Sequence, residues 1–343
     1  MVRILWLKPT KGMISIGRNL IAEEMRKRDF EVEIYECSGV RFIKALVHAL
    51  KSDYDVLIGT THLGLALGGI IKLLRDVKFI ADFVDRYGLL FKIYPIYLYP
   101  FVILTVILEK LSLKIADAVI VVPLEDYNRL VDQRSRVIKC NLCIDLDRFV
   151  YVDKKTLLKT RKILEKVGVA FNKPKVVYVG GFSKIYNLNV LIESMRYLQN
   201  FQLILIGGGK MKSYLKKLKD KLNLSNVFFL DYQPNYLISG FLRHCDVGVS
   251  LCEIPRQLKI YEYLASGLGV VVSKDVLNSN EFEFDELCVG VDLNAHDVAR
   301  GIREAMQLRT IDNYKKILKR LDNYSCKVVS KLYLKVLKEL LQK

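Results

Sequence analysis

Short apolar runs alternate with helix-like stretches along the whole chain. In the first half these runs cover residues 2–7, 31–35, 55–58, 79–81 and 118–122. In the second half they cover residues 175–179, 202–206, 227–230, 247–250 and 270–273. Short apolar runs bounded by polar loops are typical of strands buried in a parallel sheet. Helical stretches between them, at residues 16–27, 42–50, 189–198 and 211–222, predict βαβ units and an α/β fold.

The strand–helix alternation occurs twice and predicts two Rossmann-like domains. A polar, lysine-rich stretch at residues 153–173 separates the two series. We therefore expect a first domain at residues 1–160 and a second at 170–315. The last stretch, residues 313–341, is helical and rich in lysine, so residues 316–343 are expected to form a basic C-terminal helix.

The longest uncharged apolar run is IYPIYLYPFVILTVIL, at residues 93–108. Its 16 residues fall short of the ~20 that a spanning helix needs. Two interpretations remain open. The run is either a loop that enters a buried helix of the first domain or a segment that lies in a membrane interface. Tyr94, Tyr97 and Tyr99 favour the interface, because amphipathic rings prefer that position.

The charge of the chain limits its class of partner. The sequence has 54 Lys and Arg but only 37 Asp and Glu, which gives a net charge of +17. Such a charge favours nucleic acid, a phosphorylated small molecule or an anionic membrane surface. RNA-binding motifs with interleaved aromatic residues are absent, so nucleic acid is not expected. The lysine-rich helices and the apolar run together favour an anionic membrane surface.

The cysteines indicate a reducing compartment. Their number, seven, is odd, and the chain does not start like a secretory signal, so we expect reduced thiols and a cytoplasmic protein. Cys140 and Cys143 form a single C-x-x-C pair, which is a weak zinc signal without a second pair. We expect ordinary buried thiols and no metal site.

The window RQLKIYEYLASGLGVVVS, at residues 256–273, carries the most chemistry. Lys259 and Glu262 stand three residues apart and share a face near the start of a predicted helix. A helix N-terminus suits a phosphate group, and Lys259 adds a positive charge there. Glu262 is placed to accept two hydrogen bonds from the hydroxyls of a ribose. Taken alone, the pair is more often a surface ion pair.

The string KIYEYLASGLGVVVS resembles the donor-nucleotide motif of the family 4 retaining glycosyltransferases, which have the GT-B fold. The strings YVGGFSKIYNLNVLIESM, LILIGGGKMKSYL and NVFFLDYQPNYLISGFLRHCDVGVSL resemble further parts of the same domain, in the family's order. The resemblance spans nearly the whole chain, although its motifs in the first half are weak. It implies two Rossmann-like domains across a cleft, with the C-terminal helix returning toward the first. It also implies a nucleotide-sugar co-substrate, retention of configuration, and neither a metal nor a cofactor.

The resemblance assigns donor-binding roles residue by residue. Glu262 matches the ribose-binding glutamate, and Lys259 matches a lysine of the same motif; both enter the predicted catalytic set. The backbone at Gln257 and Leu258 approaches the diphosphate. The glycine turns and loop lysine expected beside the donor are Gly180, Gly181, Lys184, Gly207 and Gly208.

Two differences from the family's usual residues weaken the expected diphosphate site. Gly181 and Tyr186 stand where the family often has Arg and Lys. Lys184 is the candidate replacement in the same loop. In addition, the first glutamate of the family's pair falls on Ile254, with Glu253 one place away.

The acceptor is expected in the first domain, at the loop IADFVDRYG. The family's histidine falls near Val84, and the polar groups there are Asp82, Asp85 and Arg86. Asp85 is expected to orient an acceptor hydroxyl, as a third catalytic residue, and Arg86 to meet an acceptor phosphate. Gly12, in the first βα loop, lets the backbone approach a ligand.

These residues predict a glycosyltransferase that moves a sugar from a nucleotide sugar to a glycan or a lipid-linked acceptor, on the cytoplasmic face of a membrane. Two alternatives stay open. One is a glycosyltransferase-like protein that docks on a membrane or a partner without catalysis, which the changes at Gly181 and Tyr186 favour. The other is a GT-B enzyme of another reaction type, such as a sugar-nucleotide epimerase.

Overall fold

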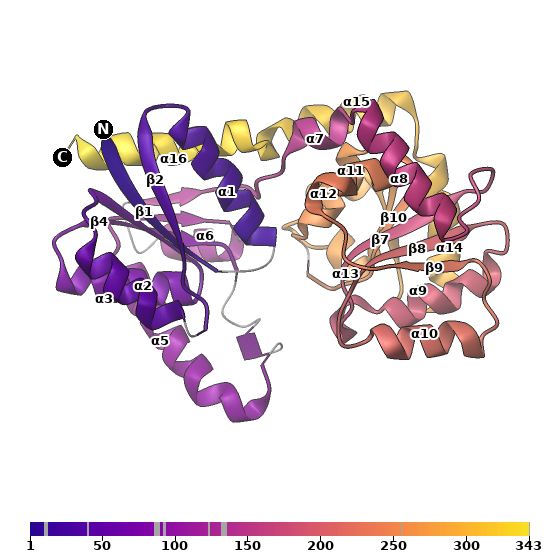
Figure 1. Cartoon of the computed structure of the whole chain (residues 1–343), viewed down its shortest axis with the longest axis horizontal. Helices are drawn as coiled ribbons and strands as arrows, with labels where there is room; N and C mark the ends of the chain where they lie inside the picture. The colour runs from indigo at the N-terminus through magenta and orange to yellow at the C-terminus, as the bar shows by residue number, and fades with distance from the viewer. Residues whose placement is uncertain are drawn as a thin grey trace. The chain divides into compact units, whose positions relative to one another are not determined.

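The computed structural model describes residues 1–9, 13–39, 41–85, 90–91, 94–122, 124–131, 136–254 and 256–342 (Figure 1). The chain divides into two compact units. Unit 1 combines Met1–Asp145 with Asn323–Lys343, and unit 2 is Leu146–Asp322. The chain therefore enters the second unit at residue 146, before the 160 expected from composition, because the helix at Lys154–Lys166 packs within unit 2.

Unit 1 is built on a six-stranded sheet in the order β2-β1-β3-β4-β5-β6, with parallel pairing throughout. The strands are β1 (Val2–Lys8), β2 (Phe30–Glu36), β3 (Val56–Thr60), β4 (Lys78–Phe83), β5 (Ala118–Val121) and β6 (Val137–Lys139). Every residue of β3 and β5 is buried, as expected for central strands covered on both faces. The first five strands are those predicted; β6, with three residues, was not.

The described helices of unit 1 are α1 (Met13–Arg26), α2 (Arg41–Lys51), α3 (Leu63–Leu74), the 3₁₀ turn η1 (Ile96–Leu98), α5 (Tyr99–Ile115), α6 (Leu124–Val131) and α16 (Cys326–Leu341). Helices α2, α3 and α5 lie on one side of the sheet, and α1 and α16 lie on the other (Figure 1). Of the predicted run at residues 93–108, residue 93 is outside the described residues, and the rest contributes η1 and most of α5. Pro100 stands at the start of α5, where its missing N–H costs no hydrogen bond.

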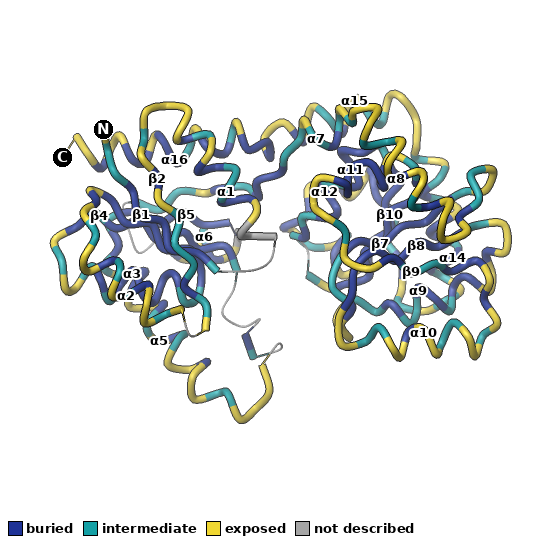
Figure 2. Tube along the Cα trace, in the orientation of Figure 1, coloured by how far each residue is buried: buried dark blue, intermediate teal, exposed yellow. Residues whose placement is uncertain are grey.

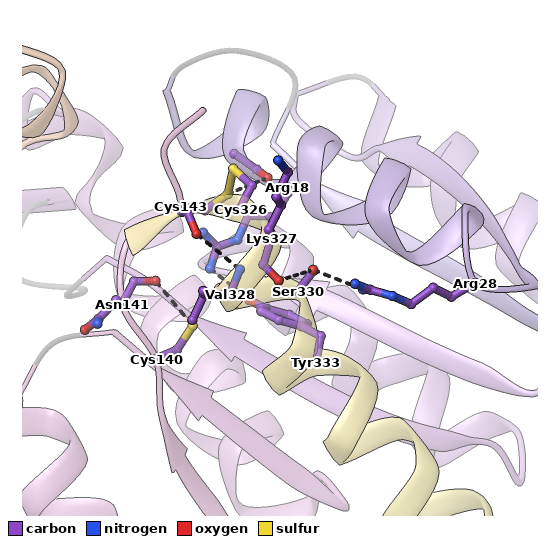
Figure 3. The surroundings of a disulfide bond; sticks show 12 residues. Arg18, Arg28, Cys140, Asn141, Cys143, Cys326, Lys327, Val328, Ser330 and Tyr333 are labelled. Carbon is purple, nitrogen blue, oxygen red and sulfur yellow. Dashed lines mark hydrogen bonds between the residues drawn. A yellow bond between two sulfur atoms is a disulfide. The ribbon is translucent and has the colours of Figure 1, made fainter. Parts of the chain in front are cut away.

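The C-terminal helix α16 packs on α1 in unit 1, which confirms the expected return toward the first domain. A disulfide joins Cys326, at the start of α16, to Cys143 (Figure 3). The expectation of seven reduced thiols is therefore wrong for these two cysteines. Their 183-residue separation in sequence hid the pairing, because only the fold brings both to one place. The cysteines outside this disulfide are all buried: Cys37, Cys140, Cys245, Cys252 and Cys288.

Unit 2 is built on a second six-stranded parallel sheet, in the order β12-β11-β10-β7-β8-β9. The strands are β7 (Lys175–Gly181), β8 (Gln202–Gly208), β9 (Val227–Leu230), β10 (Val247–Ser250), β11 (Gly269–Ser273) and β12 (Cys288–Val291). Strand β12 was not predicted; the other five were. The two sheets confirm the predicted pair of Rossmann-like units.

The helices of unit 2 surround this sheet (Figure 1). The α-helices are α7 (Leu146–Val150), α8 (Lys154–Lys166), α9 (Leu188–Ser194), α10 (Lys212–Lys221), α11 (Asn235–Arg243), α12 (Leu258–Ala265), α13 (Lys274–Leu277), α14 (Ala295–Gln307) and α15 (Ile311–Leu321). The 3₁₀ turns are η2 (Lys184–Tyr186), η3 (Met195–Tyr197), η4 (Asp285–Leu287) and, at the boundary with unit 1, η5 (Asp322–Tyr324).

The expected single helix at residues 313–341 is two helices in the structure, α15 and α16. The break falls at η5, and the side chain of Ser325 then caps α16 by accepting a hydrogen bond from the N–H of Val328. A serine cap favours a new helix start over continuation. This break lets the chain pass from unit 2 back into unit 1.

Candidate functional site

The carboxyl ends of β7 and β8 lie side by side in unit 2 and both finish in glycines. Gly180 and Gly207 have φ angles of +146° and +135°, which favour glycine. A Cβ at Gly207 would stand 2.0 Å from the carbonyl oxygen of Gly180, so only glycine allows this approach. Ligands of open parallel sheets bind outside such strand ends. The predicted residues Gly180, Gly181, Gly207 and Gly208 thus share one edge of the sheet.

Helix α12 follows β10, the strand that pairs with β7. Gln257 precedes its first turn, but its side chain is used elsewhere: it accepts from Ser250 Oγ at 2.9 Å and donates to the carbonyl oxygen of Ile254 at 2.8 Å. Within the described chain, no side chain caps the N-terminus of α12. Leu258 opens the helix, and the N–H groups of its first turn carry the partial positive charge that suits a phosphate.

Lys259 lies in that first turn and is 3% exposed, which rules out a surface ion pair. Its ammonium donates to the Tyr178 hydroxyl at 3.1 Å. It also lies 4.2 Å from the ring centroid of Tyr178 and 4.1 Å from that of Tyr186. We call these three side chains the lysine cage. Tyr186 thus contacts the buried lysine from a position where the family often has a cation.

Burial lowers the pKa of Lys259 to about 7, although Cys252 and Glu262 oppose the shift. Glu262 is half-buried one turn further along α12. Among the described residues, no carboxylate forms an ion pair with Lys259. Lys184, the candidate replacement cation, is exposed on η2. Glu253 is exposed as well.

Unit 1 has a pocket of about 390 Å³ at the carboxyl ends of its strands. Its polar residues include Thr61 and His62, which follow β3, and Asp85, which follows β4. Its apolar wall includes Phe101 and Val102 of α5. A concave, mostly apolar site with a few convergent polar groups is the usual form of a ligand pocket.

Of the four residues predicted to serve the acceptor, only Asp85 lines this pocket in the described structure. Burial raises the pKa of Asp85, while His62 and Arg18 act in the opposite direction. Arg86 and Gly12 lie outside the described residues.

Asp82 is fully buried and already occupied. Its carboxylate accepts hydrogen bonds from Arg18 at 2.7 and 2.8 Å, from Thr60 Oγ1 at 2.7 Å and from the Tyr333 hydroxyl at 2.8 Å. These donors come from α1, β3 and α16, so Asp82 ties three elements to β4. This geometry assigns it a structural role in place of the expected contact with the acceptor.

His62 and Glu109 form a pair that the sequence reasoning missed. His62 Nδ1 lies 3.2 Å from Glu109 Oε2, and the His62 backbone N–H donates to Oε1 at 3.4 Å. Glu109 is fully buried on α5. His62 has φ +44°, a strained conformation that is concentrated at functional sites. The available signal was Glu109 itself, the one acidic residue of α5, directly after the longest uncharged apolar run.

Comparison with known proteins relates this arrangement to a family. Residues 159–327, just under half of the chain, match the family described as Glycosyl transferases group 1. No curated protein sequence matches the chain.

Solved structures match over nearly the whole length. Sucrose-phosphate synthase (tll1590) from Thermosynechococcus elongatus is 15% identical, with a TM-score of 0.82 and full coverage of both chains. Anabaena Alr3699/HepE in complex with UDP-glucose is 16% identical, with a TM-score of 0.74. The match covers 99% of this chain and 100% of that chain. WaaG, a glycosyltransferase involved in lipopolysaccharide biosynthesis, is 13% identical, with a TM-score of 0.72. The match covers 98% of this chain and 99% of that chain.

The chain therefore has the GT-B fold, as the sequence motifs predicted. The match to the group 1 glycosyltransferases lies almost entirely in its second unit, and it supports a glycosyltransferase.

Proposed function

We propose that this glycosyltransferase uses a nucleoside-diphosphate sugar and transfers the sugar with retention, as the resemblance to family 4 implies. The observation that supports it most is the convergence of the glycine-ended strands β7 and β8 with the uncapped N-terminus of α12 and the buried Lys259. Structural neighbours point the same way, because Anabaena HepE was solved with UDP-glucose.

The residues of unit 2 fit the electrostatic demands of this transfer. In retaining transfer without a covalent intermediate, the leaving phosphate oxygen accepts the proton of the acceptor hydroxyl. The enzyme then has to position both substrates and neutralise the leaving diphosphate. Lys259 and the amides that open α12 supply positive charge, the backbone at Gly180 and Gly181 approaches the diphosphate, and Glu262 holds the ribose. This proposed scheme uses neither a metal ion nor a cofactor.

The pocket of unit 1 is the proposed acceptor site. Its polar end has Asp85 and the His62–Glu109 pair, which suit a hydroxyl group. Its other end is the apolar wall of α5. An acceptor with both a sugar or phosphate head and an apolar chain fits this division. A glycan on a lipid carrier is therefore the proposed acceptor, and WaaG, from lipopolysaccharide biosynthesis, is a neighbour with a related description.

An exposed apolar surface supports attachment to a membrane. Large apolar side chains on α2, α3 and α5 are exposed, and they belong to helices on one side of the sheet (Figure 2). They are Ile43, Val47, Leu50, Leu73, Leu74, Phe101, Ile103, Leu104, Ile107 and Leu111. We call this set the apolar face of unit 1. A group of exposed apolar side chains on neighbouring helices is typical of an interaction surface.

By length and composition, residues Ile96–Ile115 form one helical stretch that is apolar enough to cross a membrane. However, α5 packs along α3, and Glu109 is buried against unit 1. The helix is therefore proposed to lie in the interface, with the net charge of +17 attracting anionic lipid. The cytoplasmic face of a membrane is the proposed location.

The donor part of the proposal is tested by a thermal-shift panel of UDP, GDP, ADP, CMP and their common sugar conjugates. A ligand at 100 times its dissociation constant adds about 2.7 kcal/mol to the free energy of unfolding, which is a readable shift. We expect one nucleotide to stabilise the wild type and to lose this effect with Lys259→Ala and Glu262→Ala. Lys216→Ala, on α10, is the matched control and should keep it.

Failure of every nucleotide to stabilise the protein would favour the non-catalytic alternative, which the missing loop cations motivate. If a nucleotide sugar binds, incubation with that donor alone separates the remaining alternative. An isomerised donor would identify an epimerase, whereas an unchanged or hydrolysed donor is expected of a transferase.

A further inference from the structure

The ammonium group of Lys259 has an unusual environment for a cation. It donates a hydrogen bond to the Tyr178 hydroxyl, at 3.1 Å. That hydroxyl donates its own proton to the carbonyl oxygen of Gly181 at 2.8 Å, so its oxygen is the acceptor for Lys259. Two aromatic rings provide the remaining attraction. Cation–π contacts compensate only part of the cost of burying a charge.

Four titratable groups face this ammonium from the surrounding elements. They are Tyr178 on β7, Tyr186 on η2, Cys252 after β10 and Glu262 on α12. Burial raises the pKa of Tyr178 far above its usual value, so its hydroxyl stays neutral. Cys252 is buried and lies outside the disulfide. Glu262 favours the charged lysine but makes no ion pair with it, so in the described structure the charge has no direct counter-ion.

The cage lies beside Gly180, one of the glycines that end β7. Gly180 has φ +146°, and a Cβ placed on it would lie 3.0 Å from Lys259 Nζ and 3.1 Å from the Tyr178 hydroxyl. The absence of a side chain therefore lets the backbone at the carboxyl end of β7 lie directly against the ammonium. The uncapped N-terminus of α12 is the second feature of this place that suits an anion.

We propose that the donor diphosphate is the counter-charge that the lysine cage lacks, and that Lys259 takes up a proton when the donor binds. The proposal rests on the proposed function, because it assumes a nucleotide-sugar donor. Tyr186 then acts as a positioning residue: it holds the buried lysine where the usual loop cation is missing. The proton comes from solvent, and no covalent bond changes.

The pKa of Lys259 in the donor-free protein determines how the affinity for the donor depends on pH. Burial lowers the pKa of Lys259 to about 7, and a bound diphosphate raises it again. The affinity for the donor is therefore highest below pH 7, where Lys259 is already charged. It falls as the pH rises, by about tenfold for each pH unit well above 7. The uptake should approach one proton per donor at about pH 8 to 9.

Isothermal titration calorimetry with UDP-glucose and GDP-glucose tests this. Their diphosphate diesters do not titrate between about pH 6 and 9. The dissociation constant of the donor that binds should rise about 50-fold from pH 7 to pH 9. Two buffers with different ionisation enthalpies give the number of protons taken up. Lys259→Arg should remove the pH dependence, because a guanidinium stays charged throughout. Lys216→Arg, the matched control at an exposed lysine of α10, should leave it unchanged.

An affinity that does not change with pH, or a pH dependence that persists in Lys259→Arg, would overturn the proposal. NMR of ¹³Cε-labelled lysine supplies a second measurement, on the free protein. A Lys259 signal that titrates near pH 7 and shifts in Tyr186→Leu supports the cage. A midpoint near 10 would overturn it even if the donor binds. A midpoint near 7 without binding of either donor would instead contradict the proposed function, and the proton uptake with it.

Discussion

At the residue scale, two neighbouring aspartates have different surroundings. Asp82 and Asp85 stand three residues apart and are equally polar in the sequence. Asp82 ends inside unit 1, where Arg18, Thr60 and Tyr333 surround its carboxylate. Asp85 lines the pocket. Its role at the acceptor stays a prediction, whereas Asp82 holds the unit together.

Asp82→Asn should destabilise the protein by about 3–5 kcal/mol, because it leaves the buried guanidinium of Arg18 without its counter-charge. Urea unfolding measures the loss. The control is Asp231→Asn, whose carboxylate pairs with Lys212 at the surface and should change stability little. A loss at Asp82 no larger than that of the control would contradict the structural role.

At the scale of elements, α5 combines several roles. Val102, Val106 and Leu113 are buried on one side of it, while Phe101, Leu104 and Ile107 are exposed on the other. The same helix supplies the wall of the acceptor pocket and the carboxylate that holds His62. Of the two interpretations of its sequence, a buried helix and an interfacial segment, the structure has features of both. Membrane attachment remains a proposal.

The triple change Phe101→Ser, Leu104→Ser and Ile107→Ser should reduce binding to anionic vesicles by more than about tenfold. Each large apolar side chain contributes about 1.5–3 kcal/mol when it leaves water completely. Flotation at low salt measures the bound fraction. Ile311→Ser, which alters an exposed apolar residue of unit 2, should bind as the wild type does. If the wild type fails to float with the vesicles, or the triple variant floats equally well, the interfacial proposal is wrong.

At the scale of the whole molecule, the chain passes between its two units twice, after Asp145 and after Asp322. The two chain segments that cross between the units are linked to each other within unit 1. Ile144 and Ser325 form a parallel bridge, and Cys143 is bonded to Cys326 beside it (Figure 3). The disulfide thus closes a loop that contains all of unit 2.

Reduction of this disulfide should lower the free energy of unfolding by about 2–5 kcal/mol, because the unfolded chain regains the freedom of a very long loop. Denaturation with and without reductant measures the change. A variant with Cys143→Ser and Cys326→Ser should already be destabilised and should not respond to reductant. Alkylation of both cysteines in denatured, unreduced protein would show instead that the bond is not formed.

The sequence by itself determined the local features of this protein. Apolar runs identified ten of the twelve strands in the described chain, because a buried parallel strand needs a continuous apolar segment. The strands that it missed, β6 and β12, have only three and four residues. The window at residues 256–273 predicted a helix start beside Lys259, which is the N-terminus of α12, because a helix start and its neighbours are adjacent in sequence.

The tertiary structure alone decided which distant groups meet. Arg18, Asp82 and Tyr333 come together across separations of 64 and 251 residues. His62 meets Glu109, Cys143 meets Cys326, and Lys259 enters the space between Tyr178 and Tyr186. No local pattern encodes such contacts, since they depend on the order of strands in each sheet and on the helices that cover it. The same residue types would be solvated polar groups in an extended chain; burial turned them into a structural network, a pocket and a caged cation.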